Sequence, residues 1–106
     1  MIEQMTPAEF VRRRDAGEDL VLLDVREPHE LAKASVKGAL HIPMAQIPER
    51  LADLDRDRPL VVMCHSGGRS QAVVGFLLHR GFERVANLSG GISRWSREVD
   101  PSVPLY

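Results

Sequence analysis

The chain of 106 residues has 14 Lys and Arg against 15 Asp and Glu, a net charge of -1, and 43% hydrophobic residues. This length predicts one domain, spanning residues 1–106, and the composition is ordinary for a soluble globular protein. The balanced charge excludes a strong field for nucleic acid or a membrane surface, so we expect neither as a partner. We expect a cytoplasmic protein, because the first ten residues do not form a signal peptide and no apolar run approaches about 20 residues.

Local patterns at the start of the chain predict a helix followed by a buried strand. Thr6-Pro7-Ala8-Glu9 combines a capping box with a proline in the first turn, so a helix should run from Pro7 to about Asp15. Gly17 can adopt the left-handed conformation that ends a helix. The continuous apolar run from Leu20 to Leu23 is typical of a strand covered on both faces. A proline then favours a short helix from His29 to Ala34.

The rest of the chain alternates further strands and helices. The expected strands are residues 38–43, 60–63 and 85–88, and the expected helices are residues 47–54, 68–80 and 92–98. The tail after residue 100 is interrupted by prolines and should be irregular. Apolar strands that alternate with helices indicate an α/β fold with a parallel sheet and helices on both faces. Ligands of such sheets bind beyond the carboxyl ends of the strands, where Asp24 and Cys64 fall.

The segment Cys64-His65-Ser66-Gly67-Gly68-Arg69-Ser70 joins a predicted strand to a predicted helix and holds the chain's single cysteine. Its two glycines allow positive φ, so successive N–H groups can point into one concavity that binds an anion. The following helix adds its positive end. Such amides, together with the cation Arg69, lower the pKa of a thiol. We therefore expect Cys64 to be a nucleophilic thiolate that lies outside the packed core, although most lone cysteines are inert and buried.

The length of this segment distinguishes between two chemistries. Cysteine-dependent phosphatases use the spacing Cys-x5-Arg to surround a phosphate, whereas Cys64 and Arg69 are spaced as Cys-x4-Arg, one residue shorter. A smaller ring of amides suits a smaller guest, such as the outer sulfur of a cysteine persulfide. A single cysteine also excludes an internal disulfide and a metal site with several cysteines, and we expect no metal and no cofactor.

The chain resembles a single-domain rhodanese, a sulfurtransferase homology domain, along nearly its whole length. The segments that carry the resemblance are Leu22–Glu30, Gly38-Ala39, Ile42-Pro43, Cys64–Ser70, Gly81-Phe82, Asn87–Ile92 and Trp95. The resemblance implies a three-layer α/β/α fold around a five-stranded parallel sheet of order 3-2-4-5-1, with its first strand just before Thr6. The chain departs from the family pattern at Ala34-Ser35-Val36, where the family usually has Gly-His-Ile.

The resemblance also implies a thiosulfate sulfurtransferase that works in two steps. The Cys64 thiolate would take the outer sulfur of a donor such as thiosulfate, and the persulfide would pass it to cyanide or a thiol. Arg69 would hold the sulfonate end of the donor. The backbone of the loop would stabilise the persulfide through His65, Ser66, Gly67, Gly68 and Ser70. The alternative is a relay module that accepts sulfur from a partner protein for cofactor or tRNA thiolation.

Several other side chains have a structural as well as a functional interpretation. Asp24 and Arg26 could orient the loop or form a buried ion pair, and we expect a supporting role for both. The side chain of His65 should face solvent, and Trp95 should anchor the core. The basic run Arg12-Arg13-Arg14 fits a solvated face at the end of the first helix. No exposed apolar stripe argues for a dimer, so we expect a monomer.

Overall fold

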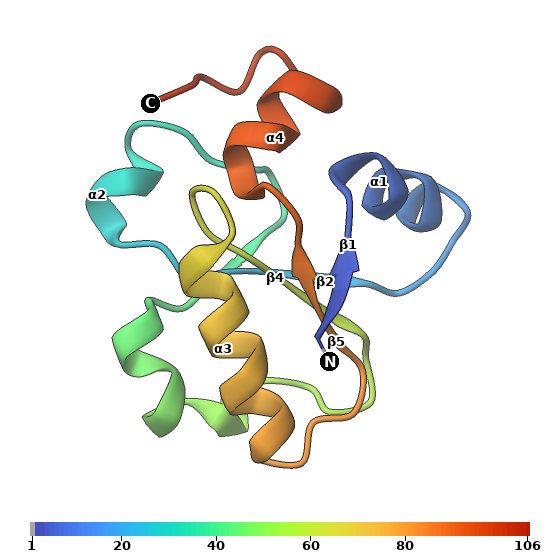
Figure 1. Cartoon of the computed structure of the whole chain (residues 1–106), viewed down its shortest axis with the longest axis vertical. Helices are drawn as coiled ribbons and strands as arrows, with labels where there is room; N and C mark the ends of the chain where they lie inside the picture. Colours follow the sequence, from blue (N-terminus) through green and yellow to red (C-terminus); the bar gives the residue numbers. More distant parts are fainter. Residues whose placement is uncertain (1) are drawn as a thin grey trace.

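The apolar runs of the sequence form a parallel sheet at the centre of the molecule (Figure 1). The structure is a computed structural model that describes residues 2–106. Its strands are β1 (Glu3–Met5), β2 (Val21–Asp24), β3 (Leu40–His41), β4 (Leu60–Met63) and β5 (Val85–Leu88). Within residues 2–106 they form one five-stranded sheet of order β1-β5-β4-β2-β3, which confirms the expected order 3-2-4-5-1 read in reverse. Asp24 pairs with Met63, so β2 and β4 end side by side.

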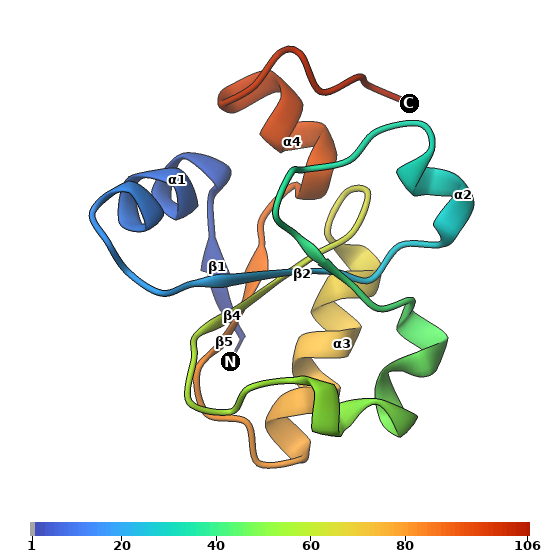
Figure 2. The same ribbon diagram turned by 180° about the vertical axis from the view of Figure 1, so that it is seen from behind.

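Helices cover both faces of the sheet, as Figures 1 and 2 show from opposite sides. The helices are α1 (Pro7–Asp15), α2 (Pro28–Leu31), α3 (Gly68–His79) and α4 (Gly91–Glu98), with 3-10 segments η1 (Met44–Glu49) and η2 (Leu51–Asp53). Side chains of β4 alternate between the two faces because successive residues of a strand point to opposite sides. Val62 packs in the cluster under α3 and η1, whereas Val61 packs in the cluster under α1 and α4. No helix in residues 2–106 is long and apolar enough to cross a membrane.

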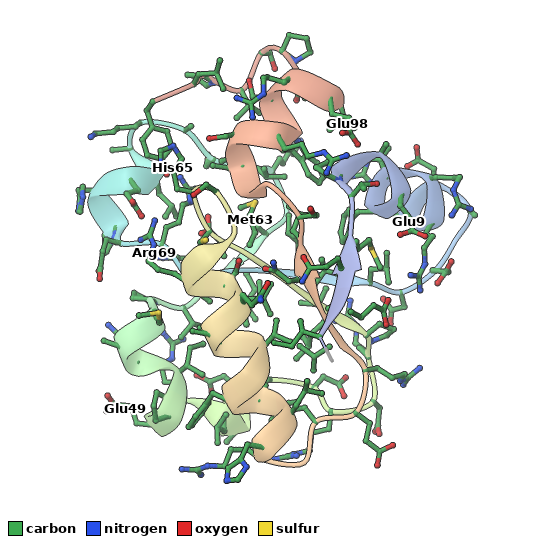
Figure 3. The ribbon with its side chains drawn as sticks, viewed as in Figure 1. Glu9, Glu49, Met63, His65, Arg69 and Glu98 are labelled. Atoms are coloured by element: carbon green, nitrogen blue, oxygen red, sulfur yellow. The ribbon has the colours of Figure 1, made fainter. Side chains whose placement is uncertain are left out.

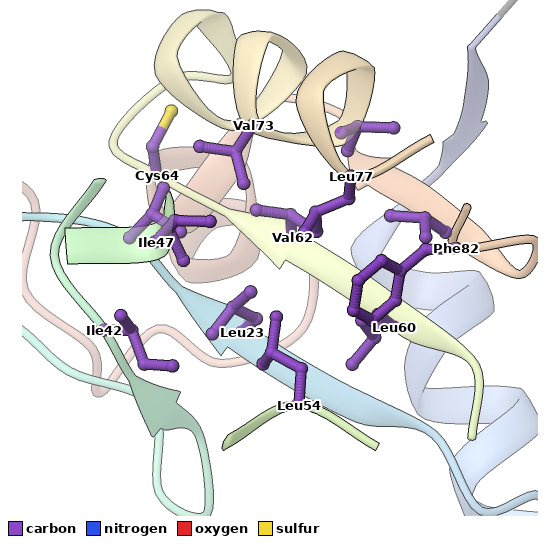
Figure 4. Close-up of a cluster of buried hydrophobic side chains, with 13 residues drawn as sticks. Leu23, Ile42, Ile47, Leu54, Leu60, Val62, Cys64, Val73, Leu77 and Phe82 are labelled. Atoms are coloured by element: carbon purple, nitrogen blue, oxygen red, sulfur yellow. The ribbon is translucent and has the colours of Figure 1, made fainter. Parts of the chain in front are cut away.

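The cluster under α3 contains the side chains that position the end of β4 (Figure 4). Leu60 and Val62 of β4 and the following Cys64 lie on this face of the sheet, in one cluster with Val73 and Leu77 of α3. On the opposite face, Trp95 of α4 is buried and contacts Phe10 of α1, with the ring centroids 5.6 Å apart. The prediction that Trp95 anchors the core is therefore confirmed.

Three sequence-based predictions of local structure are wrong. The strand expected over residues 38–43 is limited to Leu40–His41, because Gly38 lies in a turn with a φ of 88°. Residues 47–54 do not form an α-helix but two 3-10 segments, and Pro48 lies inside the first of them. Proline has no N–H to donate and clashes with the preceding turn of an α-helix, so a tighter, shorter helix forms instead. The helix predicted from His29 to Ala34 ends at Leu31. Ala34 lies beyond it, where its carbonyl oxygen accepts a hydrogen bond from the buried Arg26.

Candidate active site

Cys64 lies one residue beyond the end of β4, at the carboxyl edge of the sheet. The prediction that it lies outside the packed core is wrong, because its exposed fraction is 1% and it belongs to the cluster under α3. Its sulfur nevertheless points toward the loop and the first turn of α3 (Figure 4). There the backbone N–H of Gly67 donates to Sγ at 3.1 Å, and the Ser70 hydroxyl donates at 3.4 Å. The cysteine is therefore buried, and its sulfur is surrounded by hydrogen-bond donors instead of water.

The environment of Cys64 favours the thiolate. Burial, the largest single influence, raises the pKa of the thiol. Hydrogen bonds from the Ser70 hydroxyl and from the backbone N–H groups of Ser70, Gly67 and Ser66 lower the pKa, and together they outweigh burial. The pKa of Cys64 therefore lies below its ordinary value. These donors increase the fraction of thiolate at a given pH, and the thiolate is the form that nucleophilic attack requires.

The turn from β4 into α3 depends on Gly67. Its φ is 115°, a left-handed conformation that side chains disfavour, and its N–H then points at Sγ. Gly68 does not have a positive φ and begins α3, so one of the two glycines, not both, shapes the turn. The Ser70 hydroxyl oxygen also lies 2.5 Å from Oδ1 of Asn87 on the neighbouring β5, and because the hydroxyl has one proton, Oδ1 and Sγ compete for it. Asn87 thereby fixes the side chain that hydrogen-bonds to the sulfur.

The start of α4 supports the loop from the other side. The N–H of Ile92 donates to the Cys64 carbonyl oxygen at 2.9 Å, and the N–H of Ser93 donates to that of His65 at 3.1 Å. Gly91 lies so close that a Cβ at this position would be 2.5 Å from both carbonyl oxygens. The backbone at the start of α4 therefore meets the backbone of the loop where only a glycine fits. This contact fixes the position of the loop relative to α4.

Arg69 is bound to a carboxylate that the sequence analysis did not assign to the site. Its Nη1 and Nη2 donate to Oε2 and Oε1 of Glu30 on α2, both at 2.9 Å. Figure 3 shows the Arg69 side chain extending from the start of α3 toward α2. The ion pair raises the pKa of Arg69 and lowers the pKa of Glu30. The Cys64 thiolate also acts on Arg69 through its charge, so thiol, guanidinium and carboxylate share one site.

Asp24 and Arg26 form a buried ion pair after the end of β2, the structural alternative that the sequence left open. Arg26 has an exposed fraction of 0%, and its Nη2 lies 2.7 Å from Oδ2 of Asp24. The same guanidinium donates to the carbonyl oxygen of Ala34 and to the hydroxyl of Tyr106, both at 2.9 Å. The His41 ring hydrogen-bonds to the carbonyl oxygen of Arg26 at 2.7 Å. The pair therefore joins β2 to the segment after α2 and to the end of the chain.

His65 packs against the last residue of the chain. Its ring stacks on Tyr106 with the ring centroids 4.0 Å apart and the planes 8° from parallel. The expectation that its side chain faces solvent is therefore wrong for the stacked face, and His65 is half-buried. The tail after α4 thus reaches the loop that follows Cys64, a position that its irregular sequence did not predict.

Three functional neighbours were missed, and two of them had a signal in the sequence. Asn87 is a polar residue inside a strand that is otherwise apolar, which indicates a hydrogen bond to a neighbouring strand or loop. Glu30 comes six residues after Asp24, where the predicted strand ends, and this places a second carboxylate close to the edge of the sheet at which ligands bind. Tyr106 lies 80 residues from the Arg26 it contacts, and no local pattern connects them.

The similarity to known proteins extends over almost the whole chain. The profile of the rhodanese-like domain matches residues 6–98. A protein of Allochromatium vinosum named sulfurtransferase is 37% identical, over 97% of this chain and 96% of that protein. A protein of Stutzerimonas stutzeri named thiosulfate sulfurtransferase GlpE is 34% identical, over 94% of this chain and 89% of that protein. The crystal structure of a rhodanese-related protein from Thermoplasma volcanium has a TM-score of 0.84 and 33% identity, over 98% of this chain and 99% of the other.

Proposed function

The chain belongs to the rhodanese-like domain family, and from this we propose that it is a sulfurtransferase that carries sulfur as a persulfide on Cys64. The family and the relatives named sulfurtransferase support transfer of a sulfur-containing group through a cysteine. The observation that carries the proposal is the pair of hydrogen bonds that Sγ receives from Gly67 and Ser70. Donors at this position stabilise a negatively charged sulfur, whether it is the thiolate or the outer atom of a persulfide.

In the first half-reaction, the Cys64 thiolate attacks the outer sulfur of a donor, for which thiosulfate is the test case. A new S–S bond forms to Cys64, the S–S bond of thiosulfate breaks, and its electron pair leaves with sulfite. The charge is conserved, since a thiolate and a dianion become a persulfide anion and sulfite. The backbone amides of residues 65–70 and the positive end of α3 would stabilise the persulfide anion.

In the second half-reaction, a nucleophile attacks the outer sulfur of the persulfide and restores the Cys64 thiolate. Cyanide would leave as thiocyanate, and a thiolate would leave as a new persulfide anion. The enzyme alternates between a free and a sulfur-loaded form, so ping-pong kinetics are expected. The scheme needs a reduced thiol, and we place the protein in the reducing cytoplasm, where a lone cysteine stays free.

We assign the remaining site residues to binding and support. The persulfide would be bound by backbone amides of the loop after Cys64, which belong to His65, Ser66, Gly67, Gly68 and Ser70. Arg69 would bind the anionic end of the donor and balance the charge of the leaving group. Asp24 and Arg26 would hold the surrounding segments from below, since their ion pair is buried and makes no hydrogen bond to Cys64 among the described residues.

A second candidate, a relay that receives sulfur from a partner protein, is favoured by one observation. The guanidinium of Arg69 is already bound by Glu30. A free inorganic dianion such as thiosulfate therefore finds the charge of this cation balanced by a carboxylate. A relay would form the same Cys64 persulfide but would turn over thiosulfate slowly. The two candidates share the loading step and differ in the donor.

The proposal predicts that Cys64 gains one sulfur atom. Intact mass spectrometry after incubation with thiosulfate should show this gain on the wild-type protein, with one sulfite released for each sulfur gained. Cys64→Ser is the control and should show neither the gain nor sulfite, because a hydroxyl is far less nucleophilic than a thiolate. Cyanide added afterward should remove the gain and form thiocyanate.

The outcomes separate the candidates. Loading followed by fast turnover with cyanide and thiosulfate supports the sulfurtransferase. Loading without efficient turnover supports the relay. No loading from thiosulfate or from an organic persulfide would refute both. Hydrolysis of an aryl phosphate that is inhibited by vanadate would instead support a phosphatase.

A further inference from the structure

The carboxylate of Glu30 is held firmly against Arg69. Each of its oxygens accepts one of the two hydrogen bonds from the guanidinium, and Oε2 also accepts from the N–H of Glu27 at 3.0 Å. The Glu30 side chain has an exposed fraction of 13%, against 33% for Arg69. The carboxylate is therefore the less mobile and less screened member of the pair. It is fixed by the backbone of its own helix and not by Arg69 alone.

This arrangement changes what a donor meets at the site. Arg69 has two edges that can bind an oxyanion in two places, and Glu30 occupies the edge formed by Nη1 and Nη2, which leaves the edge formed by Nε and Nη2 for a donor. The ion pair of a guanidinium and a carboxylate has no net charge. A sulfonate that approaches the remaining N–H groups of Arg69 also approaches the carboxylate, and the repulsion grows with the charge that the donor carries.

We propose that Glu30 determines the charge of the sulfur donor and selects donors with one negative charge over donors with two. The inference rests on the proposed sulfurtransferase function and extends it by naming the donor class. Persulfides of small thiols, R–S–S⁻, and thiosulfonates, R–SO₂–S⁻, carry one negative charge, whereas thiosulfate carries two. With a persulfide anion R–S–S⁻, the thiolate of Cys64 forms a new S–S bond to the outer sulfur, the S–S bond of the donor breaks, and its electron pair leaves with the thiolate R–S⁻. The charge is conserved, because a thiolate and a persulfide anion become a persulfide anion and a thiolate.

The experiment compares two donors of similar shape and different charge. Thiosulfate and methanethiosulfonate both offer an outer sulfur on a tetrahedral sulfur, and they leave as sulfite and methanesulfinate. The value of kcat/KM for each donor is measured with cyanide as acceptor at constant ionic strength. In Glu30→Gln the ratio of thiosulfate to methanethiosulfonate should rise at least about fivefold, because the amide keeps the shape of the side chain and loses its charge.

A matched control separates this effect from a general change in surface charge. Glu18 forms a comparable ion pair, since Nε and Nη2 of Arg13 donate to it at 3.0 and 2.7 Å. It follows α1, away from the carboxyl edge of the sheet, so Glu18→Gln should leave the donor ratio unchanged. In an Arg69→Ala background, Glu30→Gln should still raise the ratio, because the carboxylate then repels the donor with no paired cation to balance it.

A failure of the proposed function and a failure of this inference give different results. If neither donor loads Cys64 in the wild type, the sulfurtransferase function is refuted. If both donors load it and Glu30→Gln leaves the ratio unchanged or lowers it, Glu30 merely positions Arg69 and the inference is wrong. Thermal unfolding of each variant checks the fold, and Glu30→Ala must raise the ratio as well if the carboxylate charge is the cause.

Discussion

At the residue scale, the sulfur of Cys64 combines two opposing influences. Burial against Val73 and Ile47 excludes water and raises its pKa, while the donors at the turn into α3 lower it. The balance depends on the Ser70 hydroxyl, which is held in place by Asn87. A thiolate in a dry site with fixed donors needs no solvent reorganisation when it attacks, which suits a sulfur carrier.

Loss of the Ser70 hydroxyl should raise the pKa of Cys64. In Ser70→Ala the thiolate loses its side-chain donor, so the pH profile of alkylation by iodoacetamide should shift to higher pH. At pH 7 the variant should then react more slowly, because a smaller fraction of the thiol is ionised. Ser66→Ala is the matched control: its contribution comes from the backbone N–H, so the profile should stay in place. An unshifted profile in Ser70→Ala would contradict this account of the pKa.

At the scale of elements, the site is where three of them meet at the carboxyl edge of the sheet. Cys64 follows β4, the turn into α3 supplies the Gly67 amide to its sulfur, and α4 supplies amides to the carbonyl oxygens of the loop. The contact with α4 requires Gly91, whose φ of 59° and close approach to the loop both disfavour a side chain. α4 thus acts as a support for the loop, in addition to burying Trp95.

Replacement by alanine should lower the free energy of unfolding far more at one glycine of the site than at another. Gly91→Ala should lower the free energy of unfolding by about 2 kcal/mol or more, since the Cβ meets two carbonyl oxygens at a positive φ. Gly68→Ala should change it by no more than about 0.5 kcal/mol, because nothing lies within 4 Å of its Cβ and it begins α3. Urea denaturation of both variants measures the difference. Equal effects would mean that α4 does not support the loop as described.

At the scale of the whole molecule, Arg26 links segments that are distant in the sequence. Its guanidinium binds Asp24 at the end of β2, Ala34 in the segment after α2, and Tyr106 at the end of the chain. Tyr106 in turn stacks on His65, the residue that follows Cys64. Burying a guanidinium is costly unless all of its donors find partners, so each partner contributes to the geometry of the site.

The final residue should therefore contribute to stability beyond its surface area. Tyr106→Phe keeps the ring on His65 and removes the acceptor of Arg26, so the free energy of unfolding should fall by about 1 kcal/mol. Leu105→Ala, at an exposed neighbouring position, should change it by less than about 0.5 kcal/mol. Urea denaturation of the two variants gives both values. A neutral Tyr106→Phe would show that the hydroxyl contact does not stabilise the fold.

The sequence predicted the elements whose causes lie within a few residues. The helix Pro7–Asp15 follows from the cap at Thr6, whose hydroxyl accepts from the N–H of Glu9, and β4 and β5 have the predicted bounds because their apolar runs are continuous. The loop after Cys64 was identified by its glycines and its position between a strand and a helix. The failures at residues 47–54 and at the end of α2 arise where a proline or a distant partner overrides helical spacing.

By itself, the sequence determined four strands of a sheet covered on both faces and the candidate nucleophile, because hydrophobic period, caps and turn residues act locally. The first strand and the strand order came only from the resemblance to a family. The tertiary structure alone decided how the site is charged. It placed Glu30 on Arg69 across 39 residues, Asn87 on Ser70 across 17, and Tyr106 on Arg26 across 80. Such contacts depend on the relative positions of whole elements, which no short stretch of sequence specifies. The physical consequence is that the cation expected to be free for the donor is paired, and the donor's charge becomes the property that the site can select.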